Sequence, residues 1–322
     1  MDIIIPGPLR PGDAVAILSP ASTVKKEYID RAARFLSDRG FRPVVMPHAD
    51  GPADGSYAAP APDRAADLMA AFRNPEIKAI LCARGGYGSV ELFPLLDPET
   101  VRENPKWLIG FSDISALHAY LVAAGVASLH APMAKHLAEE DPEHYTIASL
   151  FRILEDDNGP EIEYFSPPHP LDSYGEASGT LVGGNLAVLN GLAATPYDIF
   201  ALGRDTDEPL ILFIEDISEA IYAVERMLRR LLLTPDFSRI AGLIVGNFTD
   251  YRHPDRNFPD METMIHTLLQ RNGINNIPVC YGFPVGHTSD NLPLPEGLHA
   301  TLSVAPEGST LTLLSGSKKF FQ

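Results

Sequence analysis

The 322-residue sequence contains little cysteine and little positive charge. Its two cysteines, Cys82 and Cys280, lie inside apolar runs, and neither belongs to a CxxC pair. Buried, reduced thiols are therefore expected, and a structural zinc site is not indicated. Its 25 lysines and arginines face 42 aspartates and glutamates, which gives a formal net charge of −17. Because binding to nucleic acid needs a basic face, we expect no nucleic-acid partner.

Long hydrophobic runs are also missing. No stretch approaches the ~18 apolar residues that a membrane helix needs, so we expect no membrane association. The opening residues, MDIIIPGPLRPGD, have no basic region and only a short apolar run, unlike a signal peptide. These absences predict a cytoplasmic protein, a location in which disulfides are rare.

What the first half does contain is an alternation of short apolar runs and segments with helical spacing. Strands are predicted at 13–20, 41–47, 77–83, 106–111 and 126–132, and helices at 25–40, 63–74 and 114–125. This alternation predicts an α/β fold with a doubly wound parallel sheet, in which ligands bind at the carboxyl ends of the strands. The sequences RGGYGS (84–89) and FSD (111–113) both fall at such ends.

The second half begins after a change of texture. Residues 158–178 are rich in proline, glycine and serine without a helical period, which predicts a linker between domains at 1–157 and 179–322. Beyond it, strands are expected at 208–216, 240–247 and 277–283, helices at 218–233 and 261–273, and an antiparallel hairpin at 298–314.

The glycine-rich RGGYGS sequence follows a predicted strand. It lacks both the GxxxxGK[ST] spacing of a P-loop and the GxGxxG spacing of a dinucleotide site. A simple tight turn and a ligand-binding loop both remain open from the residue types. If the loop does bind a ligand, an anion or oxyanion fits best, because N–H groups at a helix start favour negative charge.

Ser112 lies in GFSDIS, which departs from the GxSxG nucleophile motif because Ile114 replaces the second glycine. Taken alone, the sequence favours helix capping by Ser112 or Asp113. A nucleophilic serine would also need a base and an acid that orients the base.

His287 and Glu215 are the candidates for those roles. His287, in FPVGHTSDN, directly follows an apolar strand, and LILFIED ends another strand with Glu215 and Asp216. Glu215 is the better orienting acid, because Asp216 suits a cap for the helix that begins near Ser218.

A second arrangement of histidines could point to a metal. His130 and His136 span HAPMAKH and could place two ligands together. Without carboxylates nearby, this pair is weak support for a metal site.

Six motifs together resemble the LD-carboxypeptidases, a family of cytosolic serine peptidases that includes muramoyl-tetrapeptide carboxypeptidases and microcin C immunity proteins. They are LRPGDAVAILSPAS, ARGGYGS, LIGFSDISALH, LVGGNLAVL, FIEDISEAIYAVERML and GFPVGHTSDNLPLPEG, in the family's order over nearly the whole chain. The resemblance implies an N-terminal Rossmann-like domain and a smaller C-terminal α/β domain with a barrel-like sheet. It also implies a site between the two domains and, usually, a homodimer.

The same resemblance implies roles for particular residues. Ser112 corresponds to the nucleophile, Glu215 to the acid and His287 to the general base. Backbone N–H groups of Gly86 and Asp113 would form the oxyanion hole. The mechanism would use no metal and no cofactor.

The implied activity is removal of the terminal D-alanine from cytosolic murein tetrapeptides during cell-wall recycling. An exopeptidase must bind the free carboxylate of its substrate, and Arg84 beside the glycine loop is one candidate for this role. Asn185, in VGGN, could bind the peptide. A surface arginine and a turn asparagine are the plainer interpretations of these two residues.

Three alternatives stay open. Relatives that cleave peptidyl-nucleotides such as processed microcin C tend to carry extra aromatic residues, for which this chain offers Trp107 in a strand and Tyr164, Phe165 and Tyr174 in the linker. A non-catalytic α/β protein could grip a phosphate with RGGYGS. A metal-assisted hydrolase would use His130 and His136.

Overall fold

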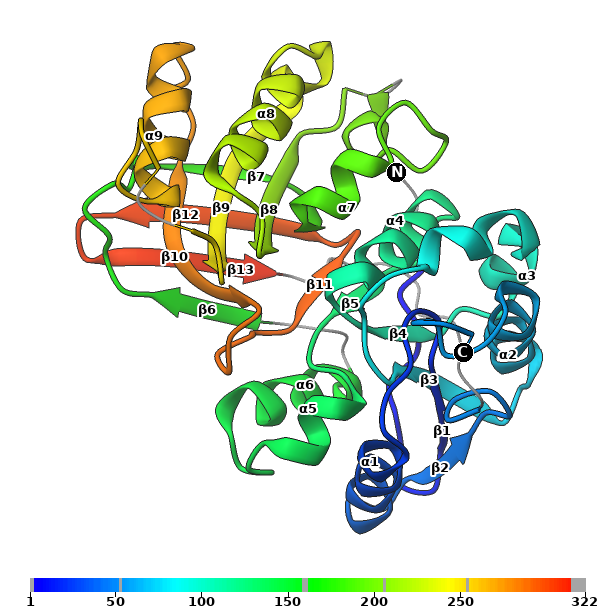
Figure 1. The fold of residues 1–322 in the computed structure, drawn as a ribbon. Coiled ribbons are helices and arrows are strands. Elements are labelled where there is room, and N and C mark those ends of the chain that lie inside the picture. Colours follow the sequence, from blue (N-terminus) through cyan, green and yellow to red (C-terminus); the bar gives the residue numbers. More distant parts are fainter. Residues whose placement is uncertain (1–2, 52–53, 158–161, 205–206, 253–254, 314–322) are drawn as a thin grey trace. The chain divides into compact units, whose positions relative to one another are not determined.

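The computed structural model describes residues 3–51, 54–157, 162–204, 207–252 and 255–313. It divides into two compact units, which are Asp2–Pro160 with Leu292–Gly297, and Glu161–Asn291 with Leu298–Gly316. Figure 1 shows the elements of each unit along the sequence. None of the helices in the described ranges has both the length and the apolar character needed to cross a membrane.

The first unit is built on a six-stranded sheet with the order β11-β5-β4-β3-β1-β2. Strands β1 to β5 pair in parallel, and β11 is antiparallel to β5. The strands are β1 (Ala14–Leu18), β2 (Arg42–Val45), β3 (Ile77–Cys82), β4 (Trp107–Gly110), β5 (Ser128–His130) and β11 (Leu294–Glu296). The predicted parallel α/β sheet is confirmed.

Helices around this sheet form two groups. In one group α1 packs against α5. In the other, α3 packs against α2 and α4. Two such groups of helices are what a doubly wound sheet requires (Figure 1). The helices are α1 (Lys26–Asp38), α2 (Ala61–Arg73), α3 (Pro98–Glu103), α4 (Ser115–Ala123), α5 (Ala134–Glu139) and α6 (Tyr145–Glu155), with the 3-10 helices η1 (Ser89–Leu95) and η2 (Ser112–Ile114).

Strand β11 comes from far along the chain and was not expected from the sequence. Pro293 and Pro295 flank Leu294 in this segment, and proline normally argues against a strand. Here the strand is at the edge of the sheet, where proline is tolerated, and Leu294 pairs with His130. The chain thus returns to the first sheet shortly after His287.

The second unit is built on a seven-stranded sheet with the order β10-β9-β8-β7-β12-β13-β6. Strands β7 to β10 are parallel, and the other pairings are antiparallel. In Figure 1, β12 and β13 run across the direction of β8 and β9, so the sheet is strongly curled, in line with the expected barrel-like form. The strands are β6 (Ile162–Ser166), β7 (Gly175–Asn185), β8 (Leu210–Ile217), β9 (Ile240–Thr249), β10 (Val279–Gly286), β12 (His299–Ala305) and β13 (Gly308–Leu313).

Short and long helices connect these strands. They are α7 (Leu186–Gly191), α8 (Ile221–Leu232) and α9 (Met261–Arg271), with the 3-10 helices η3 (Ile199–Ala201) and η5 (Pro235–Arg239). The predicted linker, 158–178, contains β6 and the first residues of β7, and its residues 158–161 lie outside the described ranges. The expected C-terminal hairpin is confirmed as β12 and β13.

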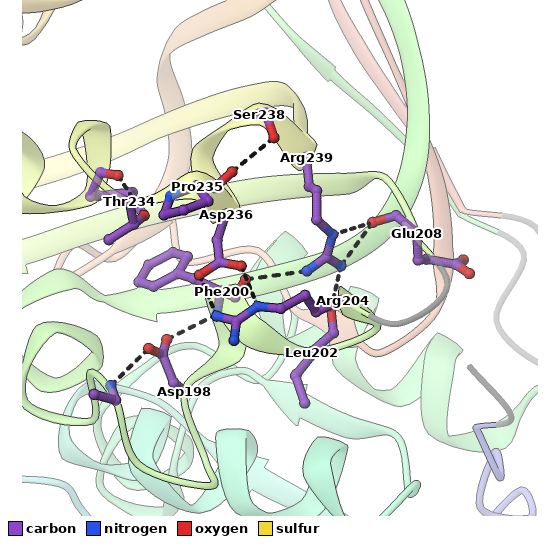
Figure 2. Close-up of polar contacts among 12 residues, drawn as sticks. Asp198, Phe200, Leu202, Arg204, Glu208, Thr234, Pro235, Asp236, Ser238 and Arg239 are labelled. Carbon is purple, nitrogen blue, oxygen red and sulfur yellow. Dashed lines mark hydrogen bonds and ion pairs between the residues drawn. The ribbon is translucent and has the colours of Figure 1, made fainter.

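A buried arginine organises the connection that precedes β8. Arg239 is 6% exposed and donates hydrogen bonds to the carbonyl oxygens of Phe200, Leu202 and Glu208 (Figure 2). Buried carbonyl groups outside a helix or sheet need donors, and one guanidinium supplies several. Arg239 therefore acts as a side-chain substitute for regular backbone pairing.

Candidate active site

Ser112 lies immediately beyond β4, in a backbone conformation that residues other than glycine rarely adopt. Its φ is 67°, in the left-handed region, which costs a non-glycine residue about 1–3 kcal/mol. The N-cap residues of η2 and α4 are Phe111 and Ile114, and neither helix has a side-chain cap. The capping role favoured by the sequence is therefore not what the structure shows for Ser112.

The glycine loop packs directly against this turn. A Cβ added at Gly85 would lie 2.9 Å from the Ser112 Cβ and 3.1 Å from the Asp113 nitrogen, so no larger residue fits there. Gly86 and Gly88 have φ values of 109° and 115°, which only glycine adopts without strain. The loop can therefore pack against Ser112 in this conformation only because these three positions are glycines.

Asp113 ties the serine turn to the end of the glycine loop. Its carboxylate accepts a hydrogen bond from the Ser89 N–H at 2.9 Å, and the residue is 5% exposed. Burial raises the pKa of Asp113, and the Ser89 hydrogen bonds partly offset this effect. The side chain of Asp113 therefore links the turn at Ser112 to the end of the glycine loop and does not cap its own helix.

The loop after β1 completes this edge of the sheet. Ser22 Oγ accepts the Tyr87 N–H at 3.1 Å, and the Ser22 N–H donates to the Gly85 carbonyl at 3.3 Å. Strands β1, β3 and β4 are neighbours, and the chain order reverses between β1 and β3. Ligands in open α/β sheets bind at such a reversal.

His118, on α4, holds the end of β4 from inside the core. Burial lowers its pKa to about 4, so the ring is neutral at pH 7. Its Nε2 lies 2.8 Å from the Gly110 carbonyl oxygen and its Nδ1 lies 2.5 Å from Ser128 Oγ. Since a carbonyl only accepts, Nε2 carries the proton, and the Ser128 hydroxyl donates to Nδ1. The strand that leads to Ser112 is fixed by this bond.

Glu215 and His287 meet within the second unit. The distance from His287 Nδ1 to Glu215 Oε2 is 2.7 Å, and the carboxylate side chain is fully buried while the imidazole is 16% exposed. Glu215 occupies an irregularity where the register of β8 on β9 shifts. Such bulges re-aim side chains near functional sites. The structure therefore brings together Glu215 and His287, the two residues predicted from the sequence to act as the orienting acid and the base.

Gly286 permits this approach. Its φ is 124°, and an added Cβ would lie 3.0 Å from the Glu215 Cβ. A neutral His287 that donates its Nδ1–H to Glu215 carries its lone pair on Nε2. An imidazole held in this tautomer by a buried carboxylate is in the form that a general base requires.

Asp216 has a different role from the one expected. Its carboxylate accepts from the Ala187 N–H at 2.9 Å and from Asn185 Nδ2 at 3.0 Å, both at the start of α7. The N-cap of α8 is Ala220, without a side-chain cap, so the predicted capping of the helix after Ser218 is wrong. Burial is the main cause that raises the pKa of Asp216 to about 6.

The two candidate substrate-binding residues differ in accessibility. Asn185 is 5% exposed and caps α7, because its Oδ1 accepts the Val188 N–H at 3.1 Å while its Nδ2 donates to Asp216. Arg84 is exposed, and its Nη1 lies 3.3 Å from the Thr23 carbonyl oxygen. Arg84 is therefore available to a ligand, whereas the amide of Asn185 is engaged in the cap.

His130 and His136, considered above as a metal pair, both contact one aromatic ring in the structure. The Phe111 ring packs against both imidazoles, with centroid distances of 5.6 Å and 5.1 Å. His136 Nδ1 accepts the Met133 N–H at 3.2 Å. Among the residues that the structure describes, no group of three or more His, Cys, Asp or Glu side chains is placed to hold a metal ion.

The two units carry the groups that a serine hydrolase needs, on an α/β architecture. The family model of the LD-carboxypeptidase N-terminal domain matches residues 15–131, and that of the C-terminal domain matches residues 178–302. The chain belongs to the LD-carboxypeptidase family and is a serine-type carboxypeptidase.

Individual relatives extend over almost the full chain. The murein tetrapeptide carboxypeptidase of Pseudomonas aeruginosa is 30% identical, over 89% of this chain and 92% of that protein. The microcin C7 self-immunity protein MccF of Escherichia coli is 26% identical, over 96% of each chain. The crystal structure of muramoyltetrapeptide carboxypeptidase from Oxalobacter formigenes superimposes with a TM-score of 0.82, at 28% identity, over 96% of this chain and 100% of that one.

Proposed function

We propose that this protein is a cytoplasmic serine LD-carboxypeptidase that removes the terminal D-alanine from murein tetrapeptides, in the recycling of cell-wall peptides. The observation that carries the proposal is the 2.7 Å contact between His287 Nδ1 and the buried Glu215 carboxylate. The proposed substrate is supported by the similarity to a murein tetrapeptide carboxypeptidase and a muramoyltetrapeptide carboxypeptidase.

In the proposed acylation step, Nε2 of His287 takes the proton from Ser112 Oγ. The oxygen attacks the carbonyl carbon of the L,D peptide bond, and Glu215 keeps the imidazole in the required tautomer and stabilises the imidazolium. The C–N bond then breaks, and the leaving D-alanine nitrogen takes the proton from His287. Attack by water on the acyl-serine, with His287 again as base, regenerates Ser112.

The backbone N–H groups of Gly86 and Asp113 are proposed to bind the oxyanion of each tetrahedral intermediate. Their support is the close packing of the glycine loop on the Ser112 turn and the left-handed backbone of Gly86. Each donor of this kind is worth about 10²–10³ in rate. The proposed mechanism uses no metal and no cofactor.

Arg84 is proposed to bind the free carboxylate of the substrate, because it is exposed and directly precedes the glycine loop. A bidentate guanidinium–carboxylate pair would select peptides with a free C-terminus. Asn185 is the weaker proposal, since its amide already caps α7. We further propose a homodimer, which light scattering of the purified protein would test.

A peptidyl-nucleotide substrate is the second candidate, favoured by the similarity to MccF. Among the aromatic side chains considered for stacking on a base, Trp107 is 1% exposed within β4 and Tyr164 is 7% exposed. Phe165 and Tyr174, at 59% and 62% exposed, are the accessible ones. The single tryptophan of the chain is thus buried, which favours the murein peptide.

The deciding experiment compares two substrates with the purified protein. One is L-Ala-γ-D-Glu-meso-diaminopimelate-D-Ala, with D-alanine release measured, and the other is an aspartyl sulfamoyl adenosine, with aspartate release measured. We expect a much higher kcat/KM for the tetrapeptide. A higher kcat/KM for the nucleotide would transfer the proposal to the second candidate, and hydrolysis of neither would contradict both.

A further inference from the structure

Arg64, on α2, has its guanidinium buried in the first unit. Its side chain is fully buried, and its donors reach three backbone carbonyls and one carboxylate. Nε donates to Ala59 O at 2.7 Å, Nη1 to Pro20 O at 2.7 Å and Gly88 O at 3.0 Å, and Nη2 to Glu91 Oε2 at 2.6 Å. One side chain therefore holds four separate points of the chain.

The three carbonyls belong to three different loops. Pro20 follows β1, Ala59 precedes α2, and Gly88 ends the glycine loop after β3. Burying a guanidinium is unfavourable unless its donors are used, and here most are used on backbone. The planar fork also fixes the angle between its acceptors, so it sets how these loops lie relative to one another.

Two short chains of contacts lead from Arg64 to the proposed catalytic groups. From Gly88, the next residue is Ser89, whose N–H binds the Asp113 carboxylate beside Ser112. The second chain runs from Pro20 to the loop that carries the serine at position 22. Ser22 Oγ accepts the Tyr87 N–H, and a Cβ added at Gly86 would collide with Ser22.

One chain of contacts thus ends at Asp113 and the other at Gly86, the two residues whose N–H groups are proposed to form the oxyanion hole. We infer that Arg64 is a positioning residue that sets the distance between the Gly86 and Asp113 N–H groups and Ser112 through these loops. This inference rests on the proposed function, because it assigns Arg64 to the same oxyanion hole. Arg64 itself touches no reacting atom.

The test uses a substitution that keeps the charge and removes the fork. In Arg64→Lys a single ammonium cannot reach all the acceptors in the geometry of the fork. The matched control is Arg239→Lys, because Arg239 is also buried and also donates to three backbone carbonyls, but in the second unit (Figure 2). Arg64→Met serves as the second variant if it folds.

Phosphonylation of Ser112 by a fluorophosphonate is measured beside D-alanine release. In that reaction Ser112 Oγ forms a bond to phosphorus, the P–F bond breaks, fluoride leaves, and the serine proton passes to His287. The phosphoryl oxygen needs the oxyanion hole, so the rate reports the hole without depending on the natural substrate.

We expect Arg64→Lys to lower kcat and the phosphonylation rate together by about 10²-fold, as small misplacements in active sites do, with KM little changed. Arg239→Lys should lower the melting temperature and leave both rates unchanged at a temperature where it is folded. The inference is overturned if Arg64→Lys reacts like the wild type, or if its rate loss only matches its unfolded fraction by circular dichroism.

The two proposals fail in different ways. A wild-type protein that is phosphonylated at Ser112 but releases no D-alanine would contradict the murein substrate, while the phosphonylation rates would still decide the role of Arg64. A wild-type protein that is not phosphonylated at Ser112 would contradict both proposals.

Discussion

The two units of this protein position their candidate catalytic groups by different means. In the first unit the glycine loop and the Ser112 turn depend on backbone conformation, with φ values of 109°, 115° and 67° at Gly86, Gly88 and Ser112. In the second unit, Glu215 and His287 depend on one hydrogen bond between side chains at the ends of β8 and β10. Both arrangements are sensitive to added atoms, since Gly286 beside Glu215 has no room for a side chain either, but only the second depends on a charged group.

Three buried polar side chains of the first unit can be compared with Glu215 of the second. In the first unit, Arg64, Asp113 and His118 all bind backbone groups, so their role is to hold loops and the end of β4 in place. In the second unit, the buried carboxylate of Glu215 binds an imidazole and can stabilise its charged form. The comparison teaches that geometry and electrostatics can be perturbed separately in this protein.

The largest expected effect is that of Glu215→Gln. The amide keeps the shape of the side chain but favours the wrong tautomer of His287, so kcat should fall by about 10⁴-fold with the fold unchanged. Glu225→Gln, on α8, is the control and should leave kcat unaltered, because Glu225 pairs with Arg229 and has no part in the proposed site. Steady-state D-alanine release measures both variants, and a wild-type kcat for Glu215→Gln would mean that the pair has no catalytic role.

Gly86→Ala should have the next largest effect. An added Cβ would collide with the Ser22 hydroxyl, and displacement of one oxyanion donor should lower kcat about 10²-fold. Gly40→Ala is the matched control, because Gly40 has a φ of 91° and open space around it. Both variants should lose about 1 kcal/mol of stability from backbone strain. Equal kcat values for the two variants would contradict the role given to the loop.

A smaller effect is expected from relief of strain at the nucleophile. Glycine accepts the 67° φ of Ser112 without strain, so Ser112→Gly should be more stable than Ser112→Ala by about 1 kcal/mol. Urea unfolding of the two inactive variants measures this difference. If the alanine variant is equally stable, the left-handed conformation is not strained in the folded protein.

The smallest expected effect concerns Asp216 and pH. Its folded pKa of about 6 exceeds the ordinary 3.8, so between these values the folded state binds more protons than the unfolded state. This group's contribution to the free energy of unfolding therefore falls as pH rises from about 4 to about 6. Asp216→Asn should remove that part of the slope in urea unfolding at several pH values. An unchanged slope would contradict the raised pKa.

Much of the fold could be predicted from local sequence patterns. The five parallel strands of the first unit have short apolar runs, and the hairpin of β12 and β13 has a clear alternation. Strand β11 could not be predicted, because Pro293 and Pro295 argue against a strand unless its place at a sheet edge is known. The bulge at Glu215 depends on pairing with β9, which no local pattern reveals.

The candidate site divides in the same way. Ser112, Glu215 and His287 follow apolar runs, so their places at strand ends could be predicted. Arg64 and His118 could not be singled out, since their partners are distant in sequence and their residue types also suit a helix surface or core. The prediction for Asp216 was wrong because a carboxylate at the end of a strand can bind the start of the next helix or the start of the helix that follows a neighbouring strand. Asp216 binds the start of α7, which follows β7.

The central claim is that Ser112 is the nucleophile of a metal-independent carboxypeptidase. The most direct measurement is D-alanine release from L-Ala-γ-D-Glu-meso-diaminopimelate-D-Ala by the wild type and by Ser112→Ala, with EDTA present. We predict that release by the wild type survives EDTA and that the variant loses at least about 10⁴-fold in kcat. Equal release by the variant would contradict the nucleophile, and loss of wild-type release in EDTA would contradict the metal-independent mechanism.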